Sequence, residues 1–353
     1  MNKKKILLDL RNLGNPASGF GQIALNYSKH FGSLQLDDIQ FVFLVPESYV
    51  PESSCHADIV RYTRELKHDH SKLPLVDIWH SVNQQQKVVR LGPDTKFVLT
   101  IHDLNYLTEK NWLRQLKHNY VLGRRIRKAD IVTAISGYVG KQVESHFRKS
   151  LGGKPVEVVY DAVEHIADKP QLQPSFADGS PFFFTIGQIR MKKNFHLLLD
   201  VMKSFPRHQL YICGDDHFEA GSLIRKRLLH EGIENVHLTG KITEEEKVWL
   251  YAHCEAFLFP SQGEGFGLPV IEAMQFGKPV FVSSFTCLPE ISSGHAYVWK
   301  DLSTASMVDD IKAHLREFNA DSSLIDSVRR HALSFSYGKH VQKYVEIYRR
   351  LMS

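Results

Sequence analysis

Two carboxylates and three glycines stand together near residue 265, and their spacing is the strongest chemical signal in the sequence. Residues 263–267 alternate glycine with Glu264 and Phe266, and Glu272 follows shortly after. An apolar strand predicted over 255–259 leads into this loop, and a helix predicted over 269–276, with Pro269 at its first position, leads out of it. A helix start offers backbone N–H groups and a positive dipole end, and glycines let a ligand approach the main chain. The stretch therefore predicts a ligand site.

Glu264 and Glu272 are predicted to hold hydroxyl groups of one ligand. One lies in the loop and the other one turn inside the helix, so they face different parts of the ligand. A general acid and base pair sharing a proton is the alternative that this placement disfavours. Two ordinary surface glutamates are the plainest alternative, which the surrounding glycines disfavour.

A second group of chemical residues follows the predicted strand over 182–186. Gly187 ends the strand, the cations Arg190, Lys192 and Lys193 come next, and Asn194 is expected to cap the following helix. Several cations at one sheet edge suit a diphosphate, although a solvated run of charges has the same composition.

The first half of the chain places candidate residues after three strands. Gly19 and Gly21 follow the first strand, and His80 and His102 each follow a later one. Ligands of open parallel sheets collect beyond the carboxyl ends of the strands. A tight turn at the glycines and hydrogen-bonded wall positions for the histidines are the alternatives.

The elements that must position these residues alternate between short apolar runs and helical patterns, which is typical of parallel α/β sheets. We expect a first domain over 1–165, a linker over the proline-containing stretch 166–181, a second domain over 182–335 and a crossing helix over 336–353 that packs back on the first domain. The expected strands are 5–10, 40–45, 57–62, 75–80, 96–101, 130–134 and 156–160, then 182–186, 209–213, 236–239, 255–259 and 279–283.

Composition excludes several classes of protein. The 353 residues suffice for two cores, and a net charge of +5 is too mild to indicate a nucleic-acid partner. The four cysteines lack metal-site spacing, so reduced thiols and no metal are expected. The apolar run over 6–8 is too short for a signal peptide, and no run reaches the ~20 residues of a membrane span, so we expect a cytoplasmic protein.

Residues 110–128 carry seven Lys or Arg and no acid. Two arrangements fit this pattern: a helix packed on its own sheet with a solvated basic side, or peripheral docking on anionic lipid at the inner face of the membrane. The apolar residues available for either contact are Trp112, Leu113, Leu116, Tyr120 and Val121.

The stretch from Glu264 to Met274 resembles the E-x7-E signature of family 4 retaining glycosyltransferases. The resemblance covers most of the chain in family order: 9–11 with 19–21, 100–103, 133–136, 158–161, 187–194, 277–280 and 289–290. It implies a GT-B fold, with two Rossmann-like domains facing across a cleft, a nucleotide sugar on the second and an acceptor on the first.

The resemblance also implies roles for individual residues. Glu272 would bind the ribose, Glu264 and the Phe266–Gly267 amides the donor sugar, and Lys193 the diphosphate. The catalytic set would be His102, Arg190, Lys193 and Glu264, and the donor-binding set Gly19, Gly21, Gly187, Lys192, Gly265, Phe266, Gly267, Leu268 and Glu272. No metal is expected, since no Asp-x-Asp stands where it could hold one beside the diphosphate.

The run from Gly187 to Asn194 resembles bacterial mannosyltransferases of surface polysaccharide assembly, which favours GDP-mannose as donor and a glycan or lipid-linked saccharide as acceptor. Two departures stand out: Gln188 replaces a common arginine, so Arg190 or Lys192 must supply that charge, and Asp161 replaces a common asparagine. A sugar-nucleotide epimerase or isomerase of the same fold, and a non-enzymatic two-domain sugar-binding protein, are the rival functions.

Overall fold

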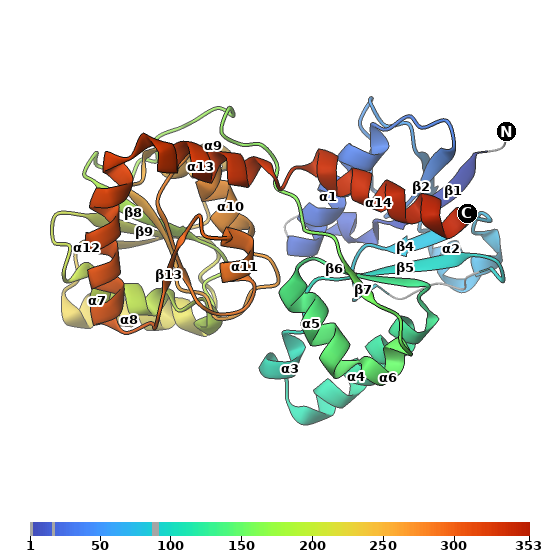
Figure 1. Ribbon diagram of the computed structural model, residues 1–353, viewed down its shortest axis with the longest axis horizontal. Coiled ribbons are helices and arrows are strands. Elements are labelled where there is room, and N and C mark those ends of the chain that lie inside the picture. Colours follow the sequence, from blue (N-terminus) through green and yellow to red (C-terminus); the bar gives the residue numbers. More distant parts are fainter. Residues whose placement is uncertain (1–2, 16–17, 87–91) are drawn as a thin grey trace. The chain divides into compact units, whose positions relative to one another are not determined.

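The computed structural model describes residues 3–15, 18–86 and 92–353, which form two compact α/β units (Figure 1). Unit 1 comprises residues 1–161 together with 337–353, and unit 2 comprises residues 162–336. This division falls a few residues before the end expected for the first domain, so the stretch 166–181, expected as a linker, is counted with unit 2.

Unit 1 is built on a parallel sheet of seven strands in the order β3-β2-β1-β4-β5-β6-β7. All seven strands lie where the apolar runs predict them, because a parallel sheet buries both of its faces. The order turns around between β1 and β4, which is where such sheets offer a crevice at their carboxyl ends. The strands are β1 Lys4–Asp9, β2 Ile39–Val45, β3 Asp58–Arg61, β4 Ile78–Ser81, β5 Lys96–Ile101, β6 Ile131–Ala134 and β7 Val156–Val158.

The helices of unit 1 begin where the sequence supplies caps. Ser18, Asn111 and Ser136 each accept a hydrogen bond from a backbone N–H of the first turn that follows. Gly19 and Gly21 therefore lie in the first turn of α1, and the tight turn considered for them is wrong. The helices are α1 Gly19–Gly32, α2 Arg64–His68, α3 Tyr106–Glu109, α4 Trp112–Lys128, α5 Gly137–His146 and α6 Arg148–Leu151, with 3-10 turns η1 Arg11–Gly14 and η2 His70–Lys72.

Unit 2 is built on a parallel sheet of six strands in the order β10-β9-β8-β11-β12-β13. Five of them were predicted, and the order turns around between β8 and β11. The sixth, β13, was missed: it has three residues, and only Trp299 among them is fully buried. The strands are β8 Phe182–Ile186, β9 Gln209–Cys213, β10 Val236–Gly240, β11 Ala256–Phe259, β12 Val280–Ser283 and β13 Tyr297–Trp299.

A helix follows Asn194 as predicted, but it begins with a 3-10 turn, and the side-chain cap predicted at Asn194 is wrong. Asn194 has a left-handed backbone with φ of 55° and joins two 3-10 turns, and its side-chain amide donates to the carbonyl oxygen of Pro260 at 3.1 Å. Thr243 and Glu246 form a capping box at the start of the helix that follows Thr243. The elements are η3 Met191–Lys193, η4 Phe195–Leu197, α7 Leu198–Met202, α8 Glu219–Glu231, α9 Glu244–His253, α10 Leu268–Gln275, α11 Leu288–Ser292, α12 Thr304–Ala320 and α13 Ser322–Leu333.

The last helix, α14 (Tyr337–Met352), returns to unit 1 and lies beside α1 (Figure 1). Its side chains Tyr344, Ile347 and Tyr348 are fully buried there. The Tyr344 hydroxyl hydrogen-bonds Thr100 of β5 at 2.8 Å, and the Tyr348 hydroxyl hydrogen-bonds His80 of β4 at 2.6 Å. The expectation that this helix packs back on the first domain is confirmed.

Candidate functional site

The glycine-rich loop leads from β11 into α10 and requires glycine at its last position. Gly267 precedes the helix with φ of 101°, and a Cβ there would lie 2.8 Å from Cδ2 of Leu288. Phe266 is only 3% exposed and its ring meets Phe335, so its side chain belongs to the core. Only the main chain of this residue can meet a ligand. Gly265 precedes it and Leu268 opens the helix, with Pro269 second rather than first.

Lys193 and Glu264 form an ion pair at the carboxyl ends of the two central strands of unit 2. Lys193 comes from the turn after β8 and Glu264 from the loop after β11. Their side chains are 13% and 12% exposed, and the Lys193 ammonium lies 4.9 Å from the centre of the Phe259 ring. Two predicted site residues from separate motifs thus meet in one partly buried pair.

Lys192 also contacts the glycine-rich loop. Its carbonyl oxygen accepts from the N–H of Gln262 at 2.7 Å, and its aliphatic stem fills the space where a side chain at Gly263 would lie. The glycine at 263 therefore gives room to this lysine.

Arg190 is held by the residue that replaces the expected arginine. Its Nε donates to the Gln188 side-chain oxygen at 3.1 Å, and its guanidinium lies over the Phe218 ring, 4.1 Å from the ring centre. Gly187, with φ of 151°, begins this segment directly after β8. Gln188 is thus a positioning residue for Arg190.

Glu272 is oriented by two side chains of α9. One carboxylate oxygen accepts from the Tyr251 hydroxyl at 2.8 Å, and the other lies 3.5 Å from the Lys247 ammonium. Burial raises the pKa of Tyr251 well above its usual value, and the charge of Glu272 raises it further. Sequence reasoning missed Tyr251 and Lys247. Because they are four residues apart on one helix, the sequence indicates that they share a face of that helix, but it does not indicate which element that face contacts.

His102 is a buried residue of unit 1 whose two ring nitrogens face protein groups. Nε2–H donates to the Val82 carbonyl at 2.8 Å, and Nδ1 lies 3.7 Å from the Asp161 carboxylate. Burial alone would lower the pKa of His102, but hydrogen bonding and the charge of Asp161 outweigh burial and raise it. The ring also packs edge-on against Phe20 of α1 at 5.3 Å. Asp161, where the resembled family commonly has asparagine, therefore raises the pKa of the predicted catalytic histidine.

Unit 1 also contains a polar cavity of about 960 Å³ beyond the end of β1. Arg11 in its wall lies 4.6 Å over the Tyr62 ring and bonds both oxygens of the fully buried Asp9, at 2.8 and 2.6 Å. Gln86 donates to Asn12 at 2.6 Å, and the other amide atom of Gln86 is buried without a partner among the described residues. Ser18 and Phe20, the sequence neighbours of the predicted donor-binding residues Gly19 and Gly21, also line this cavity.

His80 does not belong to a site. It is fully buried between Thr100, at 2.8 Å, and Tyr348. Burial lowers the pKa of His80 to about 3, so the ring is neutral near pH 7. The alternative of a hydrogen-bonded wall histidine is correct here.

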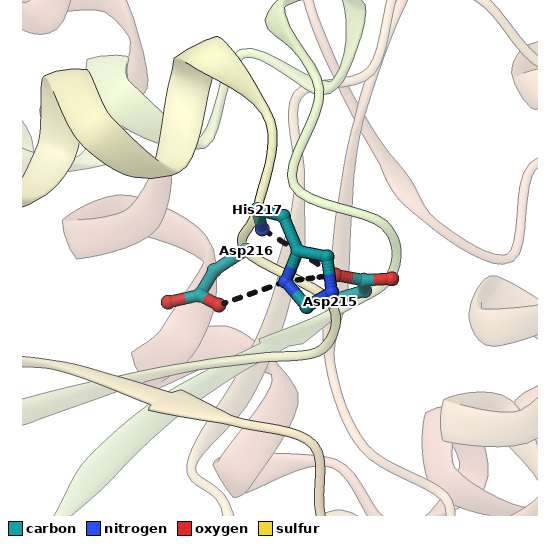
Figure 2. Close-up of side chains that lie close together, drawn as sticks. All are labelled: Asp215, Asp216 and His217. Carbon is teal, nitrogen blue, oxygen red and sulfur yellow. Dashed lines mark hydrogen bonds and ion pairs between the residues drawn. The ribbon is translucent and has the colours of Figure 1, made fainter.

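Asp215, Asp216 and His217 lie together directly after β9, with both carboxylates contacting the imidazole (Figure 2). Their donor atoms lie within 4.8 Å of one another, which makes them the one group of three metal-type donors found in the described part of the chain. Asp216 also pairs with Arg225. Cationic partners thus already meet both carboxylates, and the group carries no argument for a metal.

Comparison with known proteins identifies the relatives of this chain. Residues 168–331 match the family described as glycosyl transferases group 1. The serotype-specific mannosyltransferase WbdA of Escherichia coli is 26% identical over 285 residues, which are 73% of this chain and 34% of WbdA. The O-antigen chain mannosyltransferase C of the same species is 24% identical over 311 residues, or 84% of this chain and 76% of that protein. The chain thus spans only about a third of the length of WbdA.

Solved structures resemble the chain over nearly its full length. Sucrose-phosphate synthase from Thermosynechococcus elongatus has a TM-score of 0.75 at 17% identity and covers 99% of both chains. HepE from Anabaena, solved in complex with UDP and glucose, has a TM-score of 0.71 at 15% identity and covers 98% of this chain and 100% of its own. These structures show that the chain has the GT-B fold. Separately, no helix of the described residues is long and apolar enough to cross a membrane.

Proposed function

We propose that the chain transfers a hexose from a nucleoside diphosphate to a saccharide hydroxyl in surface polysaccharide synthesis; the match of residues 168–331 to the group 1 glycosyl transferases supports this proposal. The observation that carries this proposal is the Lys193–Glu264 pair at the carboxyl ends of β8 and β11. A cation and a carboxylate at that edge match the two chemical parts of a nucleotide sugar: a diphosphate and a set of hydroxyl groups.

The donor is held by unit 2. Glu272 accepts from the ribose hydroxyls, since Tyr251 and Lys247 hold its carboxylate in one orientation. Lys193 binds the diphosphate, and Glu264 accepts from hydroxyls of the sugar. The names of the mannosyltransferase relatives support mannose, and hence GDP-mannose, as the donor.

The reaction keeps the anomeric configuration and needs no protein nucleophile. As the bond to the diphosphate breaks, negative charge grows on the leaving group, and fixed cations stabilise that charge. Lys193 is the principal cation, with Lys192 and Arg190 supplying further charge and the start of α10 its dipole. His102 transfers no proton, because both ring nitrogens face protein groups; its raised pKa favours the protonated form. No metal is required.

The acceptor saccharide is held by the polar cavity of unit 1. Gln86 offers a buried amide atom without a described partner, and Asn12, Asn15 and Gln85 add further amides for hydroxyl groups. The Tyr62 ring lies in the same wall, 4.6 Å from the Arg11 guanidinium and 5.7 Å from the Lys67 ammonium. The enzyme works in the cytoplasm, on nucleotide sugars.

A panel of nucleotide sugars separates this function from its rivals. With GDP-mannose and a mannose-containing acceptor, we expect release of GDP and a product whose anomeric configuration, read by NMR, equals that of the donor, also in EDTA. The variant Glu272→Gln should weaken the donor, and Gln86→Ala the acceptor. An isomerised donor without transfer would make the protein an epimerase, and binding without turnover would make it a sugar-binding protein.

A further inference from the structure

One helix of unit 1 exposes a row of large apolar side chains. Trp112, Leu116 and Tyr120 of α4 follow one another at intervals of four residues and thus lie on one side of the helix, and Leu113 lies beside them. Their exposed fractions are 67% for Trp112, 57% for Leu116, 63% for Tyr120 and 60% for Leu113. Exposed large apolar residues elsewhere in the described chain are more scattered. Such a contiguous patch indicates an interaction surface.

The helix uses a different face to hold on to its own unit. Its fully buried residues are Leu122, Gly123 and Ile126, all in its C-terminal half, and a Cβ at Gly123 would lie 2.9 Å from the Ser150 hydroxyl of α6. The N-terminal half is held from the side by Tyr106 of α3, whose ring stacks on His118 at 5.0 Å between ring centres. The alternative of a helix packed on its own sheet with a solvated basic side therefore holds for the C-terminal half of α4, but Trp112, Leu113, Leu116 and Tyr120 take no part in that packing.

The charge around the apolar row has one sign. Residues 110–128 contain seven Lys or Arg and no Asp or Glu. Arg125 alone is turned inward, where it donates to the Gln84 carbonyl and burial lowers its pKa. Arg114, Lys117 and Arg124 have no ion pair with a carboxylate in the part of the chain that the structure describes, and Arg124 lies over the Tyr120 ring.

We propose that this face of α4, the apolar row with its flanking cations, docks on an anionic lipid surface. Charge complementarity selects this occupant: Trp, Tyr and Leu side chains enter the headgroup region while Lys and Arg meet lipid phosphates. A second copy of the chain would bring two sets of cations together without carboxylates between them. The proposal does not depend on the proposed function, which assigns α4 no role.

The docked helix would also bring a lipid-linked saccharide toward unit 1. Arg125 connects α4 to the Gln84 carbonyl, and the next residues, Gln85 and Gln86, line the polar cavity. One hydrogen bond, from the inward side of α4, therefore links this helix to the segment that lines the cavity proposed for the acceptor.

Flotation of the full chain with lipid vesicles tests the proposal. We expect binding to vesicles of mixed phosphatidylglycerol and phosphatidylcholine, none to phosphatidylcholine alone, and release as salt rises well above about 0.1 M. The double variant Trp112→Ser/Leu116→Ser should bind at least about tenfold more weakly. Leu75→Ser is the matched control, because Leu75 is 86% exposed elsewhere in unit 1. Transfer to a soluble acceptor should be unchanged in all three proteins.

Trp112 supplies a second measurement. Trp79 and Trp299 are buried, and Trp249 is half-buried in unit 2, where it stacks on Phe182 and His253. Lipid contact should therefore shift the emission of Trp112 to the blue, and brominated lipid should quench it. The Trp112→Phe variant should lose this response. Absence of binding to anionic vesicles at low salt, equal binding by the double variant, or a dimer in light scattering that the double variant abolishes would overturn the proposal.

Discussion

Replacing Lys193 with methionine tests whether the Lys193–Glu264 pair acts on a substrate or only stabilises the fold. The side chain keeps much of its apolar stem but loses the charge that faces Glu264 and the Phe259 ring. Removing one partner of a well-buried pair costs about 3–5 kcal/mol. Since both side chains here retain some exposure, 13% and 12%, we expect a loss of about 2 kcal/mol in the free energy of unfolding.

The catalytic loss should be larger than the loss of stability explains. A fixed cation that meets charge developing on the leaving group is worth about 3 kcal/mol of barrier, so turnover should fall by at least about 100-fold in a protein that remains folded. Turnover is measured as GDP released under donor saturation, and folding by urea denaturation at the same temperature. Lys203→Met, which removes an exposed cation of the same unit, is the control.

The double variant Lys193→Met/Glu264→Gln separates the two roles. Removing both charges leaves no unpaired ion, so the double variant should recover about 1 kcal/mol or more of stability relative to the sum of the single variants. Turnover should not recover, because each side chain is proposed to contact a different part of the donor. If turnover returns together with stability, or if Lys193→Met turns over like the wild type, the assigned roles are wrong.

Three further predictions follow from buried groups of the two units. Asp161→Asn should lower the pKa of His102, since burial is then opposed only by the hydrogen bond to Val82 and the charge of Asp103. In the wild type, the stability that the raised pKa provides is present at low pH and lost as pH rises through that pKa, as NMR titration with urea denaturation can check. His80 stays neutral in the folded protein because its pKa is about 3. The free energy of unfolding should therefore fall as pH drops below about 6.5, by up to about 1.4 kcal/mol per pH unit. A free energy of unfolding that does not change between pH 6 and 4 in about 0.1 M salt would contradict this. Gly267→Ala should cost about 1–3 kcal/mol, because its φ of 101° is strained for alanine and Leu288 fills the space; an unchanged melting temperature would show that the loop adapts.

The sheets could be predicted because parallel strands are buried on both faces and so stand out as short apolar runs. The failures have local causes. Tyr297–Trp299 is too short to register as a strand, and its place is set by pairing with β12. Asn194 reads as a helix cap, yet its side chain bonds Pro260, a residue that only the adjacency of β8 and β11 brings near.

The same limit holds in the candidate site. The sequence indicates Lys193 and Glu264 separately, each as a residue beyond a strand, but their pairing depends on β8 and β11 being neighbours although β9 and β10 lie between them in the chain. The sequence does not indicate the role of Tyr251, because its hydroxyl reaches Glu272 only when α9 packs beside α10. In the sequence, Gln188 is only a departure from the resembled family. The structure adds that its side chain accepts a hydrogen bond from Arg190.

His80 and His102 show that the pKa of a residue depends on its neighbours in the fold, which a sequence motif does not reveal. Each comes at the end of an apolar run that forms a strand of the same sheet, His80 inside β4 and His102 directly after β5, and both are buried, so the sequence treats them alike. His80 meets only hydroxyl groups, one of them carried by α14 from the far end of the chain, so burial keeps the ring neutral. His102 faces Asp161, whose charge reverses the effect of burial. A single carboxylate, Asp161, therefore raises the pKa of one of two buried histidines and favours its charged form, while the other stays neutral.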